Sequence, residues 1–433
     1  MTPKSFLGGI NLRGNKEATK SSPIEIVLPG KELVYQLAGK VGTPAKAIVK
    51  VGDRVLTGQK IAKADGFFSV PVHSSVSGIV REIKPRIIAN GEKVKCIIIE
   101  NDDLYDEIVY PKPKSVANME NTDIVSRIQD AGLVGMSGSG YPTHIKVSPP
   151  NPDKISHVIV NGLECEPFLT NDCRLMIEET DRLLSGLKIL LKLFPYARGI
   201  IAISEGNSGC MDILTDKITK KARIGIKVFK NKYPQGSERQ LIKAATGRYV
   251  DGTIMPADIG VIVINIETVI NIHRAVITGR NLTSRIVTVT GDAIQNPRNF
   301  SVRLGTSIDT LIEAAGGFRK QPEKIVSGGP MMGHALAHTN VPVTKTVAAV
   351  VCFIKDEVTK VHSTACINCN KCASVCPEQL LPSKLAMFAE FGNDEAFLWY
   401  AGTECIKCSC CSYICPAKLP VTERIVMMKG KYE

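Results

Sequence analysis

The sequence predicts a multidomain protein that combines α/β and β domains with a helical C-terminal domain. The chain has 433 residues, of which 44% are hydrophobic, enough to form several separate cores. Its N-terminal part alternates apolar and polar residues between glycines, and its middle alternates apolar strands with helical patterns. Two cysteine runs with the same spacing lie near the C-terminus. These three observations define the expected fold class.

Residues 1–112 are expected to form a small all-β domain. Segments within 44–83 alternate apolar and polar positions and are separated by glycine turns, and CIIIE at 96–100 is typical of a last strand. The stretches VGDRVLTGQKI and VSGIVREI resemble the barrel-sandwich hybrid of biotinyl and lipoyl carrier domains. Carrier domains need a lysine at their hairpin tip, where this chain has Gly66, Phe67 and Phe68. The resemblance therefore implies a scaffold without carrier chemistry.

Residues 113–280 are expected to form an α/β domain that begins with a helix and a glycine loop. The helical pattern TDIVSRIQDAGLVG precedes the loop GMSGSGYPTHIK. The loop lacks the G-x-G-x-x-G order and follows a helix, which disfavours a Rossmann site. Glycines allow main-chain N–H groups to approach a phosphate closely, and Lys146 can neutralise its charge. The alternative is a plain surface loop.

Three further stretches favour a ligand site over a plain loop. VIVNGLECEP at 158–167 and VIVINIETVINI at 261–272 are typical of buried parallel strands that end in polar side chains. Open α/β sheets bind ligands at such strand ends. KNKYPQGSERQLI at 230–242 places a glycine turn and Glu238 at the start of a helix. ARGIIAISEGN and a helix around DILTDKITKKA complete the alternating βαβ pattern.

Residues 281–355 are expected to form a β-grasp unit, because the segment 285–318 alternates strand and helix. A second glycine-rich turn follows in SGGPMMGH, where Gly328, Gly329 and Gly333 are expected to be turn residues only. No site is expected at this turn or at His334 and His338.

Two cysteine runs define the helical domain expected over residues 356–433. CINCNKCASVCP and CIKCSCCSYICP share the C-x₂-C-x₂-C-x₃-C-P spacing of two-cluster ferredoxins. In that arrangement three thiolates of a run hold one cluster, and the fourth crosses to the other cluster. The predicted ligands of two [4Fe-4S] clusters are Cys366, Cys369, Cys372 and Cys415 for one, and Cys405, Cys408, Cys411 and Cys376 for the other.

Zinc and disulfides explain the cysteine runs less well. Structural zinc sites usually pair one C-x₂-C with a second pair a dozen or more residues away. Disulfides need an oxidising compartment, and the first twenty residues carry no secretory pattern, so a reducing cytosol is expected. Cys410 lies between two predicted ligands and is expected to pack beside a cluster.

The charge and hydropathy of the chain limit its partners. A net charge of +12 is compatible with nucleic acid, an anionic lipid surface or an acidic protein. Nucleic acid is disfavoured because the basic residues are scattered and aromatic residues make up only 5% of the chain. No apolar run is long enough to cross a bilayer, so any membrane link is expected to run through a partner.

Taken together, the loop, strands and cysteines resemble the C subunit of the Rnf-type ferredoxin:NAD oxidoreductase complex, whose core is similar to the flavin subunit of respiratory complex I. The resemblance spans essentially the whole chain and implies that residues 281–355 are a soluble-ligand-binding β-grasp module. It implies non-covalent FMN, with catalytic roles for Glu238 near the reactive face of the flavin and for Tyr141 and Glu166, which match positions that contact NADH in the complex I relatives. The implied FMN-binding residues are Gly135, Gly138, Gly140, Lys146, Asn161, Glu164, Tyr233, Gly236, Glu238, Asn265 and Thr268.

The chain departs from the complex I pattern at two positions. Leu163 stands where that pattern has an acidic residue, and Ser237 stands where it has the first of two glutamates. Both departures reduce the negative charge on the nicotinamide side of the implied site.

The resemblance implies an NAD(H)-reactive FMN and iron–sulfur subunit, peripheral on the cytoplasmic side of the cell membrane. Its implied partners are NADH, other subunits of a membrane-embedded electron transport complex that moves ions, and ferredoxin reached through that complex. A two-electron flavin beside one-electron clusters fits this function. The alternative is a non-enzymatic electron-wire or docking subunit with a vestigial flavin site.

Overall fold

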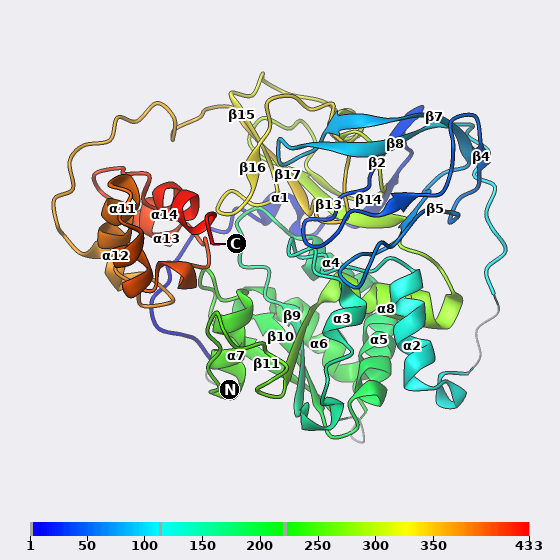
Figure 1. The fold of residues 1–433 in the computed structure, drawn as a ribbon, viewed down its shortest axis with the longest axis horizontal. Coiled ribbons are helices and arrows are strands. Elements are labelled where there is room, and N and C mark those ends of the chain that lie inside the picture. Colours follow the sequence, from blue (N-terminus) through cyan, green and yellow to red (C-terminus); the bar gives the residue numbers. More distant parts are fainter. Residues whose placement is uncertain (1–2, 112–114, 220–222, 433) are drawn as a thin grey trace.

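The computed structural model describes residues 3–111, 115–219 and 223–432 (Figure 1). Its N-terminal domain consists of two small antiparallel sheets that share one core, including Leu33, Val55, Ile61, Val80 and Ile97. This arrangement confirms the predicted barrel-sandwich hybrid. The first sheet has the order β2 (Glu32–Gln36), β8 (Lys93–Asn101), β7 (Gly78–Ile87), β4 (Arg54–Val55), and the second has the order β3 (Lys46–Ala47), β5 (Lys60–Lys63), β6 (Val72–His73).

A parallel four-stranded sheet forms the centre of the α/β domain. Its order is β11 (Ile224–Phe229), β10 (Arg198–Ser204), β9 (His157–Gly162), β12 (Val261–Asn265). Successive residues of a strand point to opposite faces, so Val158 and Val160 join one core and Ile159 joins another. Helices cover both faces, which explains why the strands are apolar throughout. Because the strands are parallel, their carboxyl ends meet at one edge of the sheet.

The helices of this domain divide between the two faces of the sheet. Most of them share the larger core, while α7 (Glu238–Thr246) packs on the opposite face through Leu241 and Ile242. The short α3 (Thr143–Lys146) follows the glycine loop. The helices of the larger core are α2 (Asn121–Asp130), α4 (Asn171–Glu178), α5 (Thr180–Leu193), α6 (Ser208–Lys217) and α8 (Ile266–Thr278).

A six-stranded mixed sheet with α9 (Ile308–Ala314) forms the third unit, where the β-grasp module was expected. One edge strand, β1 (Ile24–Val27), comes from the N-terminal part of the chain and pairs in parallel with β14, Ile24 opposite Asn299. The range 1–112 therefore contributes a strand to a unit that the sequence placed entirely within 281–355. The order is β1, β14 (Arg298–Arg303), β13 (Ser284–Thr290), β17 (Ala349–Phe353), β15 (Lys324–Ser327), β16 (His334–Ala335).

The expected boundary between residues 112 and 113 lies outside the described residues.

The C-terminal domain consists of short helices around a small core of Leu385, Phe397, Val421 and Ile425. A long connection without regular structure leads to it from the six-stranded sheet (Figure 1). Its helices are α10 (Lys371–Ser374), α11 (Pro382–Glu390), α12 (Asp394–Trp399), α13 (Cys410–Ile414) and α14 (Val421–Lys429). In residues 3–111, 115–219 and 223–432, the structure has no helix both long and apolar enough to span a membrane.

The segment before β1 connects several units. Lys4 pairs with β11, because its main-chain N–H donates to Val228 O at 3.1 Å. Ile10 and Tyr233 exchange two main-chain hydrogen bonds, of 2.8 and 2.9 Å, and Gly9 N donates to Val375 O at 2.8 Å. The start of the N-terminal segment therefore runs between the α/β domain and the C-terminal domain (Figure 1). The short α1 (Glu17–Lys20), which follows, packs against β13 and β14.

Candidate functional site

A cavity of about 500 Å³ lies at the carboxyl ends of β9 and β12. Its volume is within the range of about 300–1,000 Å³ that is typical of small-molecule sites. The glycine loop, both strand ends and the turn before α7 form one side. The other walls come from the remaining units, including Lys40 of the barrel, the turn 327–334 of the six-stranded sheet, and Cys408 of the C-terminal domain.

The cavity brings together nearly all of the residues that the sequence implied for FMN and NADH. Of these, Gly140 lies apart and lines a smaller neighbouring cavity. Its φ is +66°, and a Cβ there would come within 2.8 Å of the Cβ of Lys40, so only glycine allows this close contact with the barrel. The twelve that line the main cavity are Gly135, Gly138, Tyr141, Lys146, Asn161, Glu164, Glu166, Tyr233, Gly236, Glu238, Asn265 and Thr268.

Lys146 and Glu238 form an ion pair in the cavity wall. Lys146 closes α3, and its Nζ donates to Glu238 Oε1 at 2.7 Å and to Val263 O at 3.1 Å. Glu238 is the first residue of α7, where a carboxylate is favoured by the positive end of the helix dipole. The pair is partly exposed, so its charges remain available to a ligand in the cavity.

The polar side chains at the strand ends hold the loops of the site in place. Asn161 Nδ2 donates to Gly236 O at 2.8 Å, which fixes the turn before α7. Asn265 caps α8, since its Oδ1 accepts from Glu267 N at 2.9 Å. The Thr268 hydroxyl accepts from Met136 N at 3.1 Å and thereby anchors the glycine loop.

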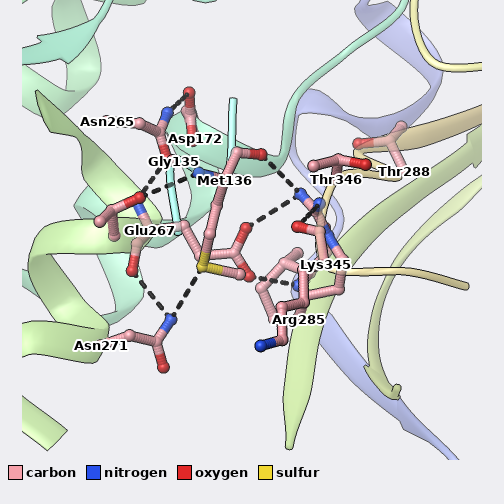
Figure 2. Close-up of polar contacts among 12 residues, drawn as sticks. Gly135, Met136, Asp172, Asn265, Glu267, Asn271, Arg285, Thr288, Lys345 and Thr346 are labelled. Carbon is pink, nitrogen blue, oxygen red and sulfur yellow. Dashed lines mark hydrogen bonds and ion pairs between the residues drawn. The ribbon is translucent and has the colours of Figure 1, made fainter. Parts of the chain in front are cut away.

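A buried ion pair beneath the glycine loop was not expected from the sequence. Arg285 of β13 donates to Glu267 Oε2 at 3.1 Å, to Lys345 O at 2.7 Å and to Met136 O at 3.4 Å (Figure 2). Ile286 N donates to Glu267 Oε1 at 2.6 Å. Burial raises the pKa of Glu267, and the Arg285 charge opposes that shift. An arginine in a strand without any other charged residue was the signal in the sequence for this contact.

Asp172 is a second residue of the site that the sequence did not indicate. It lines the cavity, and its Oδ2 accepts from Asn265 Nδ2 at 2.7 Å (Figure 2). Burial, with the nearby carboxylates Glu164 and Glu267, raises the pKa of Asp172 well above its usual value. The surroundings therefore favour the neutral form of this side chain more than water does.

The two glutamates after β9 have different surroundings. Glu164 has a positive φ of 38°, and its carboxylate accepts from Asp172 N at 2.8 Å and from Lys16 Nζ at 3.4 Å. Glu166 Oε2 accepts from Met331 N at 3.1 Å, in the turn where the sequence predicted no site. Burial raises the pKa of Glu166 to about 7. The turn 327–334 therefore belongs to the cavity wall.

Several buried polar atoms of cavity residues have no hydrogen-bond partner in the described part of the chain. They are Thr143 Oγ1, Glu166 Oε1, Asp172 Oδ1 and the Tyr233 hydroxyl. Buried polar groups are nearly always hydrogen-bonded, so these atoms fit a ligand that presents several donors and acceptors. The isoalloxazine ring and ribityl chain of FMN do so, and the adjacent glycine loop and Lys146 suit its phosphate.

The cysteine runs lie next to each other, because α10 packs against α13. The crossed set predicted from the spacing, Cys376, Cys405, Cys408 and Cys411, lines one small cavity together with Cys410. In the other predicted set, Cys366 and Cys369 are exposed, and Cys372 and Cys415 are half-buried. Among the described residues, no group of three or more His, Cys, Asp or Glu side chains is arranged to hold a single metal ion.

Cys408 connects the small cavity with the large one. It lines both cavities and packs with Ile10, Tyr233 and Cys410. Cys410 is buried in this cluster, as expected for a cysteine that packs beside the predicted ligands.

The fold and the cavity define the class of this protein as an FMN-binding oxidoreductase subunit. Residues 128–274 match the family model of the Nuo51 FMN-binding domain, residues 4–104 the RnfC barrel sandwich hybrid domain, and residues 286–335 the SLBB domain. The fold is also similar to the crystal structure of an NAD⁺-reducing [NiFe]-hydrogenase in the air-oxidized state, with a TM-score of 0.51 and 17% identity. That likeness covers 67% of this chain and 60% of the other.

Curated relatives identify the particular family. The chain is 37% identical over 389 residues to the C subunit of the Na⁺-translocating ferredoxin:NAD⁺ oxidoreductase complex of Acetobacterium woodii, covering 89% of this chain and 87% of the relative. It is 36% identical to the proton-translocating counterpart of Clostridium ljungdahlii, covering 89% and 85%. It spans about half of the C subunit of the Pseudomonas aeruginosa ion-translocating oxidoreductase complex, at 35% identity. The chain belongs to the family of C subunits of Rnf-type ion-translocating ferredoxin:NAD oxidoreductase complexes, as its sequence predicted.

Proposed function

We propose that this protein exchanges electrons between NAD(H) and the rest of its complex through non-covalent FMN and two [4Fe-4S] clusters. The observation that carries the proposal is Cys408, which lines both the flavin cavity and the small cavity of the predicted cluster ligands. The names of the relatives in Acetobacterium woodii and Clostridium ljungdahlii, which contain ferredoxin and NAD⁺, support the substrates. We place the protein peripherally on the cytoplasmic side of the cell membrane, with ferredoxin reached through the other subunits.

The residues of the cavity have distinct tasks in this proposal. When bound, FMN exchanges a hydride with nicotinamide and passes electrons onward singly. The glycine loop at Gly135 and Gly138, with Lys146, holds the cofactor, and Asn161 keeps the turn at Gly236 in position beside it. Asn265 and Thr268 anchor the loop and helix that face its phosphate end.

We further propose that Tyr141, Glu166 and Glu238 contact the nicotinamide substrate. All three line the cavity, and Glu238 is held by Lys146 at the start of a helix. The walls of the cavity come from four different units, so the proposed contacts meet where these units join.

The proposal also gives an order to the clusters. Cys376, Cys405, Cys408 and Cys411 would hold the cluster next to the flavin, because Cys408 reaches its cavity. The set that includes the exposed Cys366 and Cys369 would hold the cluster next to a partner protein of the complex. Electrons would then leave or enter through the surface of the C-terminal domain.

Anaerobic spectroscopy tests this function. Stopped-flow mixing of the purified protein with NADH should bleach the flavin absorbance and then the cluster absorbance. Glu238→Gln should slow the flavin step by about a hundredfold at matched FMN content, because an orienting group contributes through proximity. If the wild-type protein holds a full complement of FMN and is not bleached, the electron-wire alternative replaces the dehydrogenase. If only the Glu238→Gln rate is unchanged, Glu238 loses its role.

A further inference from the structure

The hairpin tip between β5 and β6 lies against the flavin domain. In a carrier domain this tip would present a lysine, whereas here it presents two aromatic rings. Phe67 and Phe68 pack edge to face with ring centroids 5.5 Å apart. Phe68 packs in the same way on Tyr141 at 5.8 Å, and Phe67 packs on His144 at 6.4 Å. The tip between β5 and β6 is therefore fixed to Tyr141 and His144, which follow the glycine loop.

The backbone of the tip is also held in place. Phe67 O lies 3.3 Å from His144 Nε2, and Phe68 O accepts from Thr43 N at 3.1 Å. Despite these contacts, the side chains remain open to solvent, since Phe67 is 67% exposed and Phe68 is 40% exposed. Two ordered aromatic rings thus have faces that the protein does not cover, next to a residue of the cavity wall, Tyr141.

A cation lies at the same edge of the cavity. Lys40 lines the cavity, and its Nζ donates to Gly138 O of the glycine loop at 2.7 Å. The Cβ atom of Lys40 packs close to Gly140, which directly precedes Tyr141. Burial lowers the pKa of Lys40, and the charge of Lys407, in the C-terminal domain, adds to this shift. An anion placed here would meet the side chain of Lys40.

We propose that Phe67, Phe68 and Lys40 form the subsite for the adenosine diphosphate half of the dinucleotide. The proposal rests on the function proposed above, in which the nicotinamide half enters the cavity. A dinucleotide carries a doubly charged pyrophosphate in its middle and a purine at its far end. The structure offers partners for both groups at one edge of the cavity, where Lys40 contacts Gly138 and Phe68 packs on Tyr141. Exposed aromatic faces stack on purines, and an ammonium pairs with pyrophosphate oxygens.

The subsite explains why the barrel-sandwich domain remains although its carrier lysine is absent. The domain supplies both the cation and the rings, whereas the flavin-binding residues belong to the α/β domain. Flavin binding and dinucleotide binding are therefore separable by substitution.

Calorimetric titration of the holoprotein with ADP-ribose, which lacks nicotinamide, tests the subsite. Phe67→Leu/Phe68→Leu and Lys40→Met should each weaken ADP-ribose binding about tenfold. FMN content and binding of nicotinamide mononucleotide should stay unchanged in the double ring variant, whereas Lys40→Met is compared at matched FMN content, because Lys40 also contacts the glycine loop. Phe68→Tyr keeps an aromatic face and should retain the wild-type affinity. Phe391→Leu, which changes an exposed aromatic residue of the C-terminal domain, is the matched control.

The outcomes separate this inference from the proposed function. Equal affinity of wild type and the double variant for ADP-ribose, or no binding of ADP-ribose to the wild type, would overturn the subsite. A wild-type protein that binds ADP-ribose through these residues but is not bleached by NADH would retain the subsite and overturn the dehydrogenase. If the double variant loses FMN or folds poorly, Lys40→Met and Phe68→Tyr decide the question.

Discussion

Lys146 illustrates how a single residue connects the loop, the helix and the strand of the site. Its Nζ joins α3 to Glu238 at the start of α7 and to Val263 in β12. A lysine in this position links two walls of the cavity through Glu238 and Val263, and its charge can also turn toward a phosphate in the cavity.

Lys146→Ala should lower FMN occupancy and leave the iron content unchanged. A charge-assisted hydrogen bond contributes about 1.5–3 kcal/mol, so the dissociation constant for FMN should rise by about tenfold or more. Fluorescence of released FMN, normalised to iron, measures this. Lys154→Ala, at an exposed lysine, is the control. Equal FMN content in the two variants would exclude Lys146 from the site.

Which residues of the site could be predicted depends on how far apart their partners lie. The glycines, Lys146 and the polar residues after the strands stand in local patterns, so the sequence indicated them directly. Asp172 could not be found in this way, because its partner Asn265 is 93 residues distant in the chain. Cys408 was predicted as a cluster ligand, but its place in the flavin cavity depends on the packing of two domains.

At the scale of elements, the contact between α8 and β13 is the one that single substitutions should disturb most. Glu267 lies in the first turn of α8 and Arg285 in β13, and both side chains are almost completely buried. Removal of one partner leaves a buried charge without compensation, whereas removal of both does not.

Glu267→Ala should therefore destabilise the α/β domain by about 3–5 kcal/mol. Glu267→Met/Arg285→Met should recover much of this loss, since apolar residues of similar size often replace a buried ion pair at little cost. Urea denaturation followed by flavin fluorescence gives the two midpoints. A double variant as unstable as Glu267→Ala would mean that shape, not charge, makes this contact important.

The crossing of the cysteine runs is a second property of elements rather than of single residues. Cys376 follows α10 in the first run, but it lines a cavity with four thiols of the second run, three of which are predicted ligands of the same cluster. Cys376→Ala should thus perturb the same electron paramagnetic resonance signal as Cys411→Ala, and a different one from Cys369→Ala. A shared signal for Cys376→Ala and Cys369→Ala would show that each run holds its own cluster.

The sequence predicted most elements but not all of their pairings. The strands of the α/β sheet and the start of α7 at Glu238 follow from apolar runs and a glycine turn, and the structure confirms them. The pairing of β1 with β14 could not be predicted, because a strand of four residues carries little periodicity and its partner lies in a distant part of the chain.

At the scale of the whole molecule, Lys345 joins three units. This lysine of the six-stranded unit donates from its Nζ to Pro71 O of the barrel at 3.0 Å and to Gly132 O of the α/β domain at 2.8 Å. Burial lowers the pKa of Lys345 to about 7. Burial and the Lys345 charge also hold the pKa of the neighbouring His73 well below its usual value, so His73 stays neutral above pH 7.

The stability of the protein should rise with pH in a window set by Lys345. Between about pH 7 and 10.5 the unfolded chain holds a proton on this lysine that the native protein does not hold, so the native state gains stability as pH rises. The gain is at most about 1.4 kcal/mol per pH unit. Thermal midpoints measured from about pH 7 to 9.5 should therefore increase more in the wild type than in Lys345→Met.

Lys320→Met, at an exposed lysine of the same unit, should keep the wild-type pH dependence. Parallel curves for wild type and Lys345→Met would show that Lys345 keeps an ordinary pKa in the folded protein.

The parallel pairing of β1 with β14 has a consequence for synthesis on the ribosome. Residue 24 emerges long before residue 299, and at about 5–20 residues per second the delay amounts to tens of seconds. During that time the first strand of the nascent chain has no partner, and an unpaired strand is a site for wrong association. Nascent chains arrested before residue 298 should therefore depend on chaperones, whereas chains that have released β14 should not. Because of the order of translation, β1 is synthesised early but is among the last strands to pair with its neighbour in the sheet.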